Sequence, residues 1–529
     1  MMRNNQTKAV IILSAVLLLL VLVYIFVSIP MKNEMNKTPD VTAAVPETED
    51  GEAVGLANKI LVYPQVSTDD IQSIIVINEY GRYKIYRNAE TDSPEIEGFE
   101  GVAFHEQNMS SLMTSCGYPL AITRVGKTED LSEYGLDKTL DENGNVVEQP
   151  PRFVMKTKDG VEYKCYIGDK ITTGTGYYFL YEGRPDTVYV LDTSIAETLL
   201  APVEVLVEPM IITPMTQNDY FMVHDFILRR YDQTIICFDY IEEADRKGTE
   251  FETSTYRMLY PQNITPSAEA ISAAMKQIYQ AGGDEQAETK LEVVCLGVND
   301  ETLAKYNIGD DAYVVQYDYW ERDLSTAGSP VTVRENMILI SPRNPDGSYY
   351  VASPYFQQIV KAEAEAFDFL TWDLFDWVEA PFFQMKIGYV TDISVSDGRG
   401  FEVDYKLEGE GQELVVTEVN TGYKPDVNNF RQFYKTLLYS SYEGDCSLES
   451  SEMEALKALD DSEAQVVFTV KTDAGRVLTY KFYQYSERRS YVTLNGEGEF
   501  YCLKTVAEKI LADAKRVQSG EPITSTDKY

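Results

Sequence analysis

The feature that most constrains the fold is a block of sequence that occurs twice, with a weaker copy between the two. Its beginning reads Phe-Val-Met-Lys-Thr-Lys-Asp-Gly at 153–160 and Phe-Thr-Val-Lys-Thr-Asp-Ala-Gly at 468–475. Its end reads Ser-Ile-Ala-Glu-Thr-Leu-Leu at 194–200 and Thr-Val-Ala-Glu-Lys-Ile-Leu at 505–511. An internal repeat of this kind determines the architecture before any single motif is considered.

Alternating apolar residues within the block predict strands, and spacings of three and four residues predict helices. Each unit is predicted as a strand pair, a helix, a meander of strands and a closing helix. This is an α+β fold with antiparallel sheets. Ser194 with Glu197, and Thr505 with Glu508, predict capping boxes at the starts of two closing helices.

In the first unit, apolar side chains at positions 109, 112, 113 and 116 predict a helix that ends at a left-handed Gly117. Two strands before it are expected to meet at a turn containing Gly81. In the third unit, Asp426 is expected to open a helix with Phe430 and Phe433 on its apolar face.

The middle copy is less regular. Its Leu-Ala-Lys-Tyr-Asn-Ile at 303–308 echoes Leu-Ser-Glu-Tyr-Gly-Leu at 131–136. A helix is expected from Thr265-Pro266, and a closing helix from Ser353-Pro354 that carries Ile359 and Val360 on one face. The segments predicted along the chain are a cytoplasmic tail (1–8), a transmembrane anchor (9–31), a linker (32–68), repeat unit 1 (69–205), a degenerate repeat unit 2 (218–380), repeat unit 3 (386–515) and a flexible tail (516–529).

The anchor is predicted from an uncharged stretch between Ala9 and Met31. Twenty apolar residues from Val10 to Ile29, at about 1.5 Å each, match the roughly 30 Å hydrocarbon core of a bilayer. The stretch is too long for a signal peptide and lacks a small-residue cleavage site, and no cysteine that lipoprotein processing would need precedes Cys116. The acidic body favours a cytoplasmic N-terminus with the body outside the cell membrane.

The body is strongly acidic. Removing Arg3, Lys8 and Lys32 from the 46 basic residues of the chain leaves 43 against 85 acidic residues, a net charge of −42. Long-range repulsion of phosphate argues against nucleic acid as a partner. Calcium loading, a basic partner and simple solubility all fit this charge, and solubility is the plainer interpretation.

The six cysteines are spread widely and contain no Cys-x-x-Cys pair, which argues against zinc and thioredoxin-like sites. Cys165 and Cys295 fall in phase with apolar strand residues, so both are predicted as buried thiols. One disulfide is compatible with the sequence, which does not indicate which two cysteines would form it.

Several motifs together carry a resemblance to a known family. They are Leu-Ser-Glu-Tyr-Gly-Leu-Asp at 131–137, Tyr-Ile-Gly-Asp at 166–169, Gly-Tyr-Tyr at 176–178 and Val-Tyr-Val-Leu at 188–191. In these the chain resembles the bacterial domain of unknown function 4340 family, over 70–205 and more loosely to 380. One departure is Thr139-Leu140, where the family usually has a proline.

The resemblance implies one N-terminal membrane helix and an auxiliary extracytoplasmic role beside ABC transporters of the gliding-motility type. The implied partners are the permease and ATPase subunits of such a transporter. The family carries no established catalytic residues, so the resemblance assigns no catalytic, cofactor-binding or metal site.

Candidate chemistry in the residues themselves is sparse. The two histidines, His105 and His224, have no nucleophile motif near them, and packing or surface roles are the plainer interpretation. The loop 168–176 lacks the order of a phosphate-binding loop and is predicted as a hairpin and a candidate contact loop. The chain is therefore predicted not to be an enzyme and to need no cofactor, although a carboxylate pair of a hydrolase is not excluded.

Acidic and aromatic clusters leave alternatives open. Asp310-Asp311, Asp460-Asp461 and 141–145 could bind calcium, but none follows the order of an EF-hand. Aromatic residues at 317–320 and 483–485 could bind a glycan or peptide, although tyrosine also suits a half-buried strand. The first hypothesis is thus a non-enzymatic, membrane-anchored auxiliary component of an ABC-type transport system. The alternative is an envelope module that binds wall glycan or calcium without a transporter.

Overall fold

The computed structural model describes residues 47–49, 51–137, 139–140, 146–212, 219–281, 291–323, 325–446 and 450–523. Two compact units divide the chain: one contains the residues up to 98 together with 106–203, and the other contains 99–105 together with the residues from 204 on. The predicted tail (1–8) and anchor (9–31) lie outside the described residues. Within the described ranges, no helix is long and apolar enough to cross a membrane.

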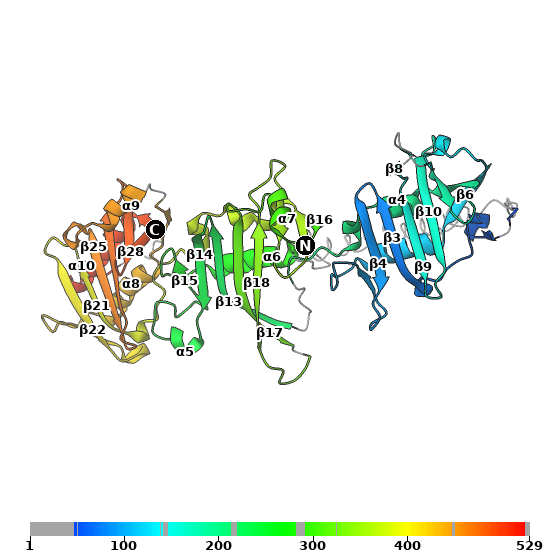
Figure 1. The fold of residues 1–529 in the computed structure, drawn as a ribbon. Helices are drawn as coiled ribbons and strands as arrows, with labels where there is room; N and C mark the ends of the chain where they lie inside the picture. Colours follow the sequence, from blue (N-terminus) through cyan, green and yellow to red (C-terminus); the bar gives the residue numbers. More distant parts are fainter. Residues whose placement is uncertain are drawn as a thin grey trace, which may run out of the picture. The chain divides into compact units, whose positions relative to one another are not determined.

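Both units combine helices with antiparallel sheets, so the predicted α+β class is confirmed (Figure 1). The first unit holds a ten-stranded sheet with the order β1-β2-β6-β12-β11-β10-β9-β3-β4-β5, and a separate hairpin of β7 and β8. These strands are β1 (Ala53–Val54), β2 (Ile60–Leu61), β3 (Ile71–Asn78), β4 (Gly81–Arg87), β5 (Pro94–Ile96), β6 (Leu120–Lys127), β7 (Thr139–Leu140), β8 (Val146–Glu148), β9 (Arg152–Thr157), β10 (Glu162–Lys170), β11 (Gly176–Tyr181) and β12 (Thr187–Asp192).

The second unit holds two eight-stranded sheets, ordered β15-β14-β13-β17-β18-β19-β20-β16 and β23-β22-β21-β25-β26-β27-β28-β24. Strands of the second sheet are β13 (Asp219–Arg230), β14 (Gln233–Tyr240), β15 (Tyr256–Tyr260), β16 (Leu291–Leu296), β17 (Tyr313–Asp323), β18 (Thr332–Ile340), β19 (Tyr349–Ala352) and β20 (Gln358–Ala362). Strands of the third sheet are β21 (Val390–Ser396), β22 (Glu402–Glu408), β23 (Val415–Glu418), β24 (Gly444–Asp445), β25 (Val466–Thr472), β26 (Val477–Gln484), β27 (Arg489–Leu494) and β28 (Glu497–Leu503).

The three sheets share one connection order. In each, a three-stranded meander comes first, a helix follows, and a single edge strand comes next. A four-stranded meander then fills the space between the edge strand and the first meander. The first sheet differs in one respect, because β1 and β2 extend it beyond the edge strand β6.

Helices pack together in pairs, α3 with α4, α6 with η6 and α8 with α10. The helices are α3 (Glu106–Gly117), α4 (Thr193–Leu200), α5 (Glu243–Arg246), α6 (Ala268–Ala281), α7 (Asp300–Lys305), α8 (Val427–Leu438), α9 (Ser450–Lys457), α10 (Lys504–Ser519) and the 3-10 helix η6 (Ala364–Thr371). Asp426 caps α8 as predicted, by accepting a hydrogen bond from the amide of Asn429 at 2.9 Å. Phe430, Phe433 and Leu437 on this helix are fully buried, and burial of each side chain stabilises the fold by about 1.5–3 kcal/mol.

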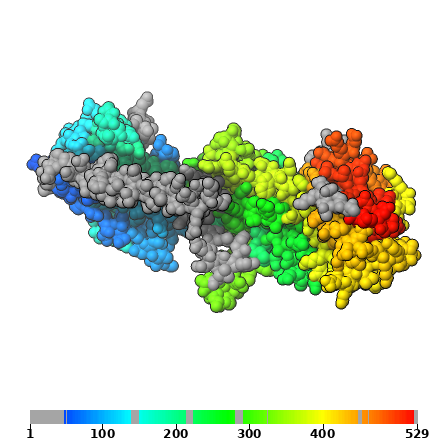
Figure 2. All heavy atoms as spheres, turned by 180° about the vertical axis from the view of Figure 1, so that it is seen from behind, coloured from blue at the N-terminus to red at the C-terminus, as the bar shows by residue number. Residues whose placement is uncertain are grey.

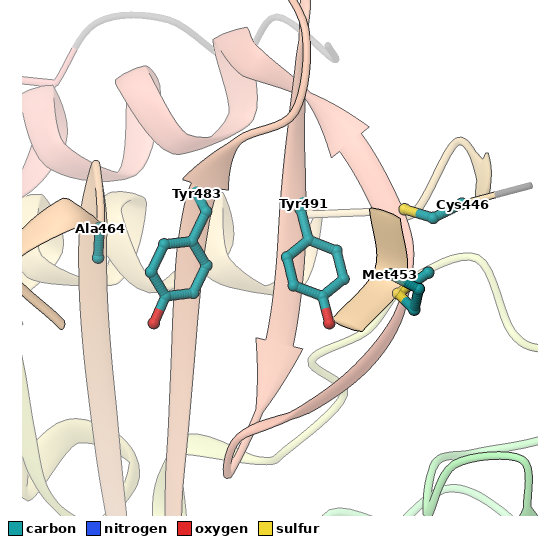
Figure 3. Packing of buried hydrophobic residues seen from close by; sticks show 5 residues of the cluster. All are labelled: Cys446, Met453, Ala464, Tyr483 and Tyr491. Carbon is teal, nitrogen blue, oxygen red and sulfur yellow. The ribbon is translucent and has the colours of Figure 1, made fainter. Parts of the chain in front are cut away.

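A smaller apolar cluster lies on three neighbouring strands of each sheet. In the third sheet, Tyr483 pairs with Tyr491 across β26 and β27, and their rings lie on the same side of the sheet near Cys446 and Met453 (Figure 3). The matching row in the first sheet is Tyr166, Leu180 and Val188, and in the second it is Leu339, Ala352 and Ile359. The segment that follows the edge strand covers each row.

The second and third sheets contact each other within the second unit, where the green and yellow surfaces meet in Figure 2. Arg476 forms an ion pair with the buried carboxylate of Glu250, and Lys386 forms one with Glu252 at 3.0 Å. The buried Gln262, which follows β15, bonds to strand β28 of the third sheet. Its side chain donates to the carbonyl oxygen of Glu497 at 3.1 Å and accepts from the amide of Glu499 at 3.0 Å.

Two predicted capping boxes are wrong. The N-cap of α4 is Asp192, which accepts a hydrogen bond from the amide of Ser194, so Ser194 lies inside the helix. The N-cap of α10 is Leu503, which gives no side-chain cap, so Thr505 also lies inside. The preceding strands run directly into both helices, and the helical conformation therefore begins before the predicted hydroxyl residues.

Two further expectations need correction. Gly117 is the last residue of α3 and not a left-handed residue beyond it, and a Cβ there would overlap the carbonyl oxygen of Val66. The closing helix predicted from Ser353-Pro354 is wrong, because Gln358–Ala362 forms the strand β20 and only the 3-10 helix η6 follows. The apolar pair Ile359 and Val360 is buried on both faces of the sheet, and such a run does not distinguish a buried strand from a helix.

The limits of the predicted linker and tail also differ from the structure. Strands β1 and β2 lie within 32–68, and β2 pairs with β6. Helix α10 continues to Ser519, inside the range predicted as a flexible tail, and Ile523 beyond it is buried.

Candidate functional site

The segment 131–137, which carries most of the family resemblance, folds as a single turn over the first sheet. The 3-10 helix η4 (Ser132–Tyr134) ends at Gly135, whose φ of 65° lies in the left-handed region that favours glycine. The amide of Leu136 donates to the carbonyl oxygen of Leu131 at 3.2 Å. This turn places Leu136 on the sheet, where it is buried.

The echo of this motif in the second sheet ends in the same left-handed turn, although the longer α-helix α7 precedes it. Asn307 takes the place of the glycine with a φ of 55°, a conformation that asparagine tolerates better than most residues. The ring of Tyr134 meets Tyr178 edge-on at 4.8 Å, and the ring of Tyr306 meets Tyr350 edge-on at 4.9 Å. The repeated sequence is therefore a repeated cover for one face of the sheet.

Other family motifs lie against this turn. A Cβ on Gly168 would overlap the carbonyl oxygen of Tyr134, so the close approach of the two backbones requires glycine. A Cβ on Gly135 would lie 2.6 Å from a carboxylate oxygen of Asp169. The motifs at 131–137 and 166–169 thus pack closely against each other, and these contacts give them a structural role.

Beside this turn lies a groove with a volume of about 420 Å³, which we name the motif groove. Its lining residues are Glu129, Asp130, Leu131, Ser132, Leu136, Asp137, Tyr166, Leu180, Glu182 and Pro185. The floor is apolar, and the four carboxylates on its rim are exposed. The volume falls within the range of pockets that hold ligands or side chains of partners.

One lysine contributes to the electrostatics of the groove. The ammonium of Lys164 lies 2.8 Å from the carboxylate of Glu182 and 5.4 Å from the centre of the Tyr166 ring. These contacts, Glu182 first, raise the pKa of Lys164 and keep it charged. The hydroxyl and amide of Ser132 both donate to Asp130 and lower the pKa of that carboxyl group. The rim is therefore negatively charged at neutral pH.

The predicted contact loop, 168–176, is a hairpin connection between β10 and β11. Gly174 has a φ of 73°, and its amide donates to the carbonyl oxygen of Ile171 at 2.8 Å. The hydroxyl of Thr193 donates to the carbonyl oxygen of Gly174 at 3.2 Å. The loop itself is not among the residues that line the motif groove.

The structure gives the two histidines different surroundings. His105 directly precedes α3, and its amide donates to the carbonyl oxygen of Leu206 at 3.0 Å. The imidazole Nδ1 of His224 lies 2.7 Å from the carboxylate of Asp225, and its ring stacks on Trp320 at 4.9 Å. These contacts orient the imidazole of His224 against an aromatic ring and a carboxylate, which is a packing arrangement.

All six cysteines are free thiols. Cys116, Cys165, Cys446 and Cys502 are buried, and burial raises the pKa of Cys446 to about 12. The predicted burial is confirmed for Cys165 and only in part for Cys295, which is half-buried beyond a bulge in β16. Thiols with raised pKa values are poor nucleophiles.

The predicted aromatic and acidic clusters are explained by packing and turns. Tyr317 and Tyr319 are buried in the second sheet, and Tyr483 is buried in the third, so their structural interpretation is confirmed. The carboxylate of Asp460 accepts a hydrogen bond from the amide of Ser462 in a turn. Residues 141–145 lie outside the described residues. In the part of the chain that the structure describes, no group of three His, Cys, Asp or Glu is arranged to hold a metal ion.

Sequence reasoning missed a buried cradle at the start of the first sheet. The side chain of Glu52 is fully buried, and its carboxylate accepts hydrogen bonds from Arg124 at 3.1 Å and from the Tyr189 hydroxyl at 2.6 Å. Arg184 forms an ion pair with the same carboxylate at 3.0 Å. The cradle fastens the segment before β1 to the sheet. No local pattern distinguishes Glu52 from the acids around it, so only the fold reveals it.

Comparison of this chain with family models, with curated proteins and with solved structures finds no match. The resemblance to the domain of unknown function 4340 family therefore stays a prediction from the motifs at 131–137, 166–169, 176–178 and 188–191.

Proposed function

We propose that this protein is a non-enzymatic, membrane-anchored, extracytoplasmic auxiliary component of an ABC-type transport system. The observation that carries the proposal is the way the chain enters its first sheet. The segment that follows the predicted anchor is held by the buried carboxylate of Glu52 and by the pairing of β2 with β6. Such a firm attachment suits a body that works at a defined distance from the membrane.

The length of the intervening chain supports a position close to the membrane. Fifteen residues, 32–46, separate the predicted anchor from the described chain, and even a fully extended chain of that length spans only about 50 Å. With the predicted anchor in a membrane, this reach supports a position of the first sheet within contact range of the outer parts of a membrane complex. The acidic charge of the body keeps it away from anionic lipid headgroups.

Three sheets with one connection order support a role in binding. Each presents a covered, partly apolar face, and the motif groove opens beside one of these covers. A chain built from similar modules offers several surfaces for macromolecular partners. The permease and ATPase subunits remain the partners that the family resemblance implies.

Co-purification tests this proposal directly. The full-length protein is extracted in mild detergent, and the membrane proteins that accompany it are identified by mass spectrometry. We expect an ABC permease and its ATPase in stoichiometric amounts. Retention on wall material without any membrane partner would contradict the proposal and favour an envelope-binding module.

A further inference from the structure

The motif groove exists because the first sheet has the smallest of three equivalent covers. The row Tyr166, Leu180 and Val188 lies under η4, a turn of three residues, whereas α7 in the second sheet has six residues and α9 in the third has eight. In the third sheet, Met453 and Leu456 of α9 pack on the equivalent row. Beside the half-buried Leu131, the short cover leaves a groove that Tyr166 and Leu180 line, although each of these two side chains is only 5% exposed.

The rim of the groove is charged with one sign. Among the described residues, Glu129, Asp130 and Asp137 form no ion pair with lysine or arginine, and only Glu182 has a basic partner, Lys164. An apolar floor next to several exposed carboxylates suits a ligand that has an apolar side chain beside a positive charge. Anionic lipid, nucleic acid and acidic peptides would meet repulsion at this rim.

We propose that the motif groove binds a protein segment that lays an apolar side chain on Leu131 and Leu136 and directs lysine or arginine side chains to Glu129 and Asp137. This inference rests on the proposed function, because it names the surface through which the auxiliary component contacts its partner. Complementary charge at the rim sets the specificity and the association rate, and burial of the apolar side chain supplies most of the affinity.

Binding of defined peptides to the full-length protein in detergent tests the groove. The probe is a fluorescein-labelled Lys-Lys-Leu-Leu-Lys peptide, followed by fluorescence anisotropy. Two comparison peptides separate the contributions: Ser-Ser-Leu-Leu-Ser lacks the charge, and Lys-Lys-Ser-Ser-Lys lacks the apolar side chains. We expect both to bind at least about tenfold more weakly than the probe.

Two matched variants locate the binding. Glu129→Gln with Asp137→Asn removes two rim charges, and Glu79→Gln with Glu90→Gln removes two exposed charges from the same unit outside the groove. Each exposed ion pair changes affinity by up to about fivefold, so the rim variant should bind the probe about tenfold more weakly, and added salt should reduce this difference. The variant outside the groove should bind like the unaltered protein.

The inference would be overturned if the rim variant and the unaltered protein bound the probe with equal affinity. It would also be overturned if Ser-Ser-Leu-Leu-Ser or Lys-Lys-Ser-Ser-Lys bound the unaltered protein as tightly as the probe does. The two proposals fail separately. If the peptide pattern holds and no ABC subunit co-purifies, the proposed function fails and the groove stands. If ABC subunits co-purify equally with the rim variant, and the probe does not bind, the groove inference fails and the function stands.

Discussion

Replacement of Glu52 by glutamine should detach the start of the chain from the first sheet without unfolding the rest. The carboxylate is the shared acceptor of Arg124, Arg184 and Tyr189, and it also accepts a hydrogen bond from the amide of Glu49 at 2.8 Å. Glutamine keeps the shape of the side chain but removes the charge and one acceptor oxygen. Both guanidinium groups would then lose their main partner in a buried site.

The size of this destabilisation depends on the contacts that Arg124 and Arg184 keep when Glu52 is replaced. Loss of one partner from a buried ion pair costs about 3–5 kcal/mol. Arg184 still donates to the carbonyl oxygen of Gly51 at 2.7 Å, and Arg124 still reaches Glu49 at 3.7 Å. We therefore expect the lower limit, about 3 kcal/mol, for the free energy that holds this segment on the sheet.

Hydrogen exchange of the full-length protein measures this local free energy. The amide of Val62 donates to the carbonyl oxygen of Pro119 at 3.2 Å, so peptides that contain Val62 report whether the segment is attached. A loss of about 3 kcal/mol corresponds to about a hundredfold faster exchange there. Peptides from the second and third sheets should exchange as in the unaltered protein.

Glu49→Gln is the matched control for this change. Glu49 is partly exposed and pairs with Arg124 at 3.7 Å and with Lys127 at 3.2 Å. Exposed pairs contribute about 0–1 kcal/mol, so exchange at Val62 should rise less than about fivefold. Equal acceleration of exchange at Val62 by Glu49→Gln and Glu52→Gln would show that burial does not make the Glu52 ion pairs stronger than the exposed pairs of Glu49.

The segment held by Glu52 should also detach from the first sheet at low pH. Burial alone raises the pKa of Glu52, but hydrogen bonds from Arg124, Tyr189 and the Glu49 amide outweigh it and hold the pKa below the ordinary value of 4.5. Because this pKa is lowered in the folded protein, the ionised carboxylate stabilises the attached segment above pH 4.5. This stabilisation is lost as the pH falls through the pKa of Glu52 in the folded protein. Protection at Val62, corrected for intrinsic exchange, should be constant from pH 7 to 5 and fall below 4.5, whereas Glu52→Gln should show no such fall.

Three further changes test other parts of the fold. Gly168→Ala should lower the free energy of unfolding by about 1–3 kcal/mol, because the added Cβ has no space. Gly309→Ala is the control: no atom lies within 4 Å of a Cβ added there, so thermal unfolding should change little. Gln262→Ala removes two partly buried hydrogen bonds between the second and third sheets and should cost about 2 kcal/mol, seen as faster proteolysis at their junction. Asp513→Ala removes a fully buried carboxylate that binds Lys509 and should lower the free energy of unfolding of the second unit by about 3 kcal/mol, measured by urea denaturation. Unchanged stability of Gly168→Ala, Gln262→Ala or Asp513→Ala would contradict the close packing, the hydrogen bonds or the buried ion pair assigned to that residue.

Much of the fold is predictable from periodicity and turn chemistry. The turn at Gly81, the apolar face of α3 and the cap of α8 at Asp426 follow from local patterns, and the structure confirms each. Local patterns fail where tertiary context decides. Ile359 and Val360 suit either a buried strand or a helix, and only the partner strands β19 and β16 select the strand.

The candidate site was only partly predictable. The repeated motif at 131–136 and 303–308 was visible as a pattern, but its role as a cover for the sheet depends on contacts with Gly168 and Tyr178 that are distant in sequence. Glu52 lies in a stretch rich in acids, and its two arginines follow about 70 and 130 positions later, so no local signal joins them. Long-range electrostatic partners of this kind emerge only once the strands are paired.

Crosslinking mass spectrometry of intact membranes tests whether the first sheet lies beside an ABC transporter. A lysine-reactive crosslinker applied to cells that carry the full-length protein reports the neighbours of its first sheet in place. We expect crosslinks from Lys127 and Lys164, which lie near the cradle and the motif groove, to an ABC permease. Crosslinks from these lysines only to wall-associated proteins, with none to a transporter subunit, would contradict this expectation.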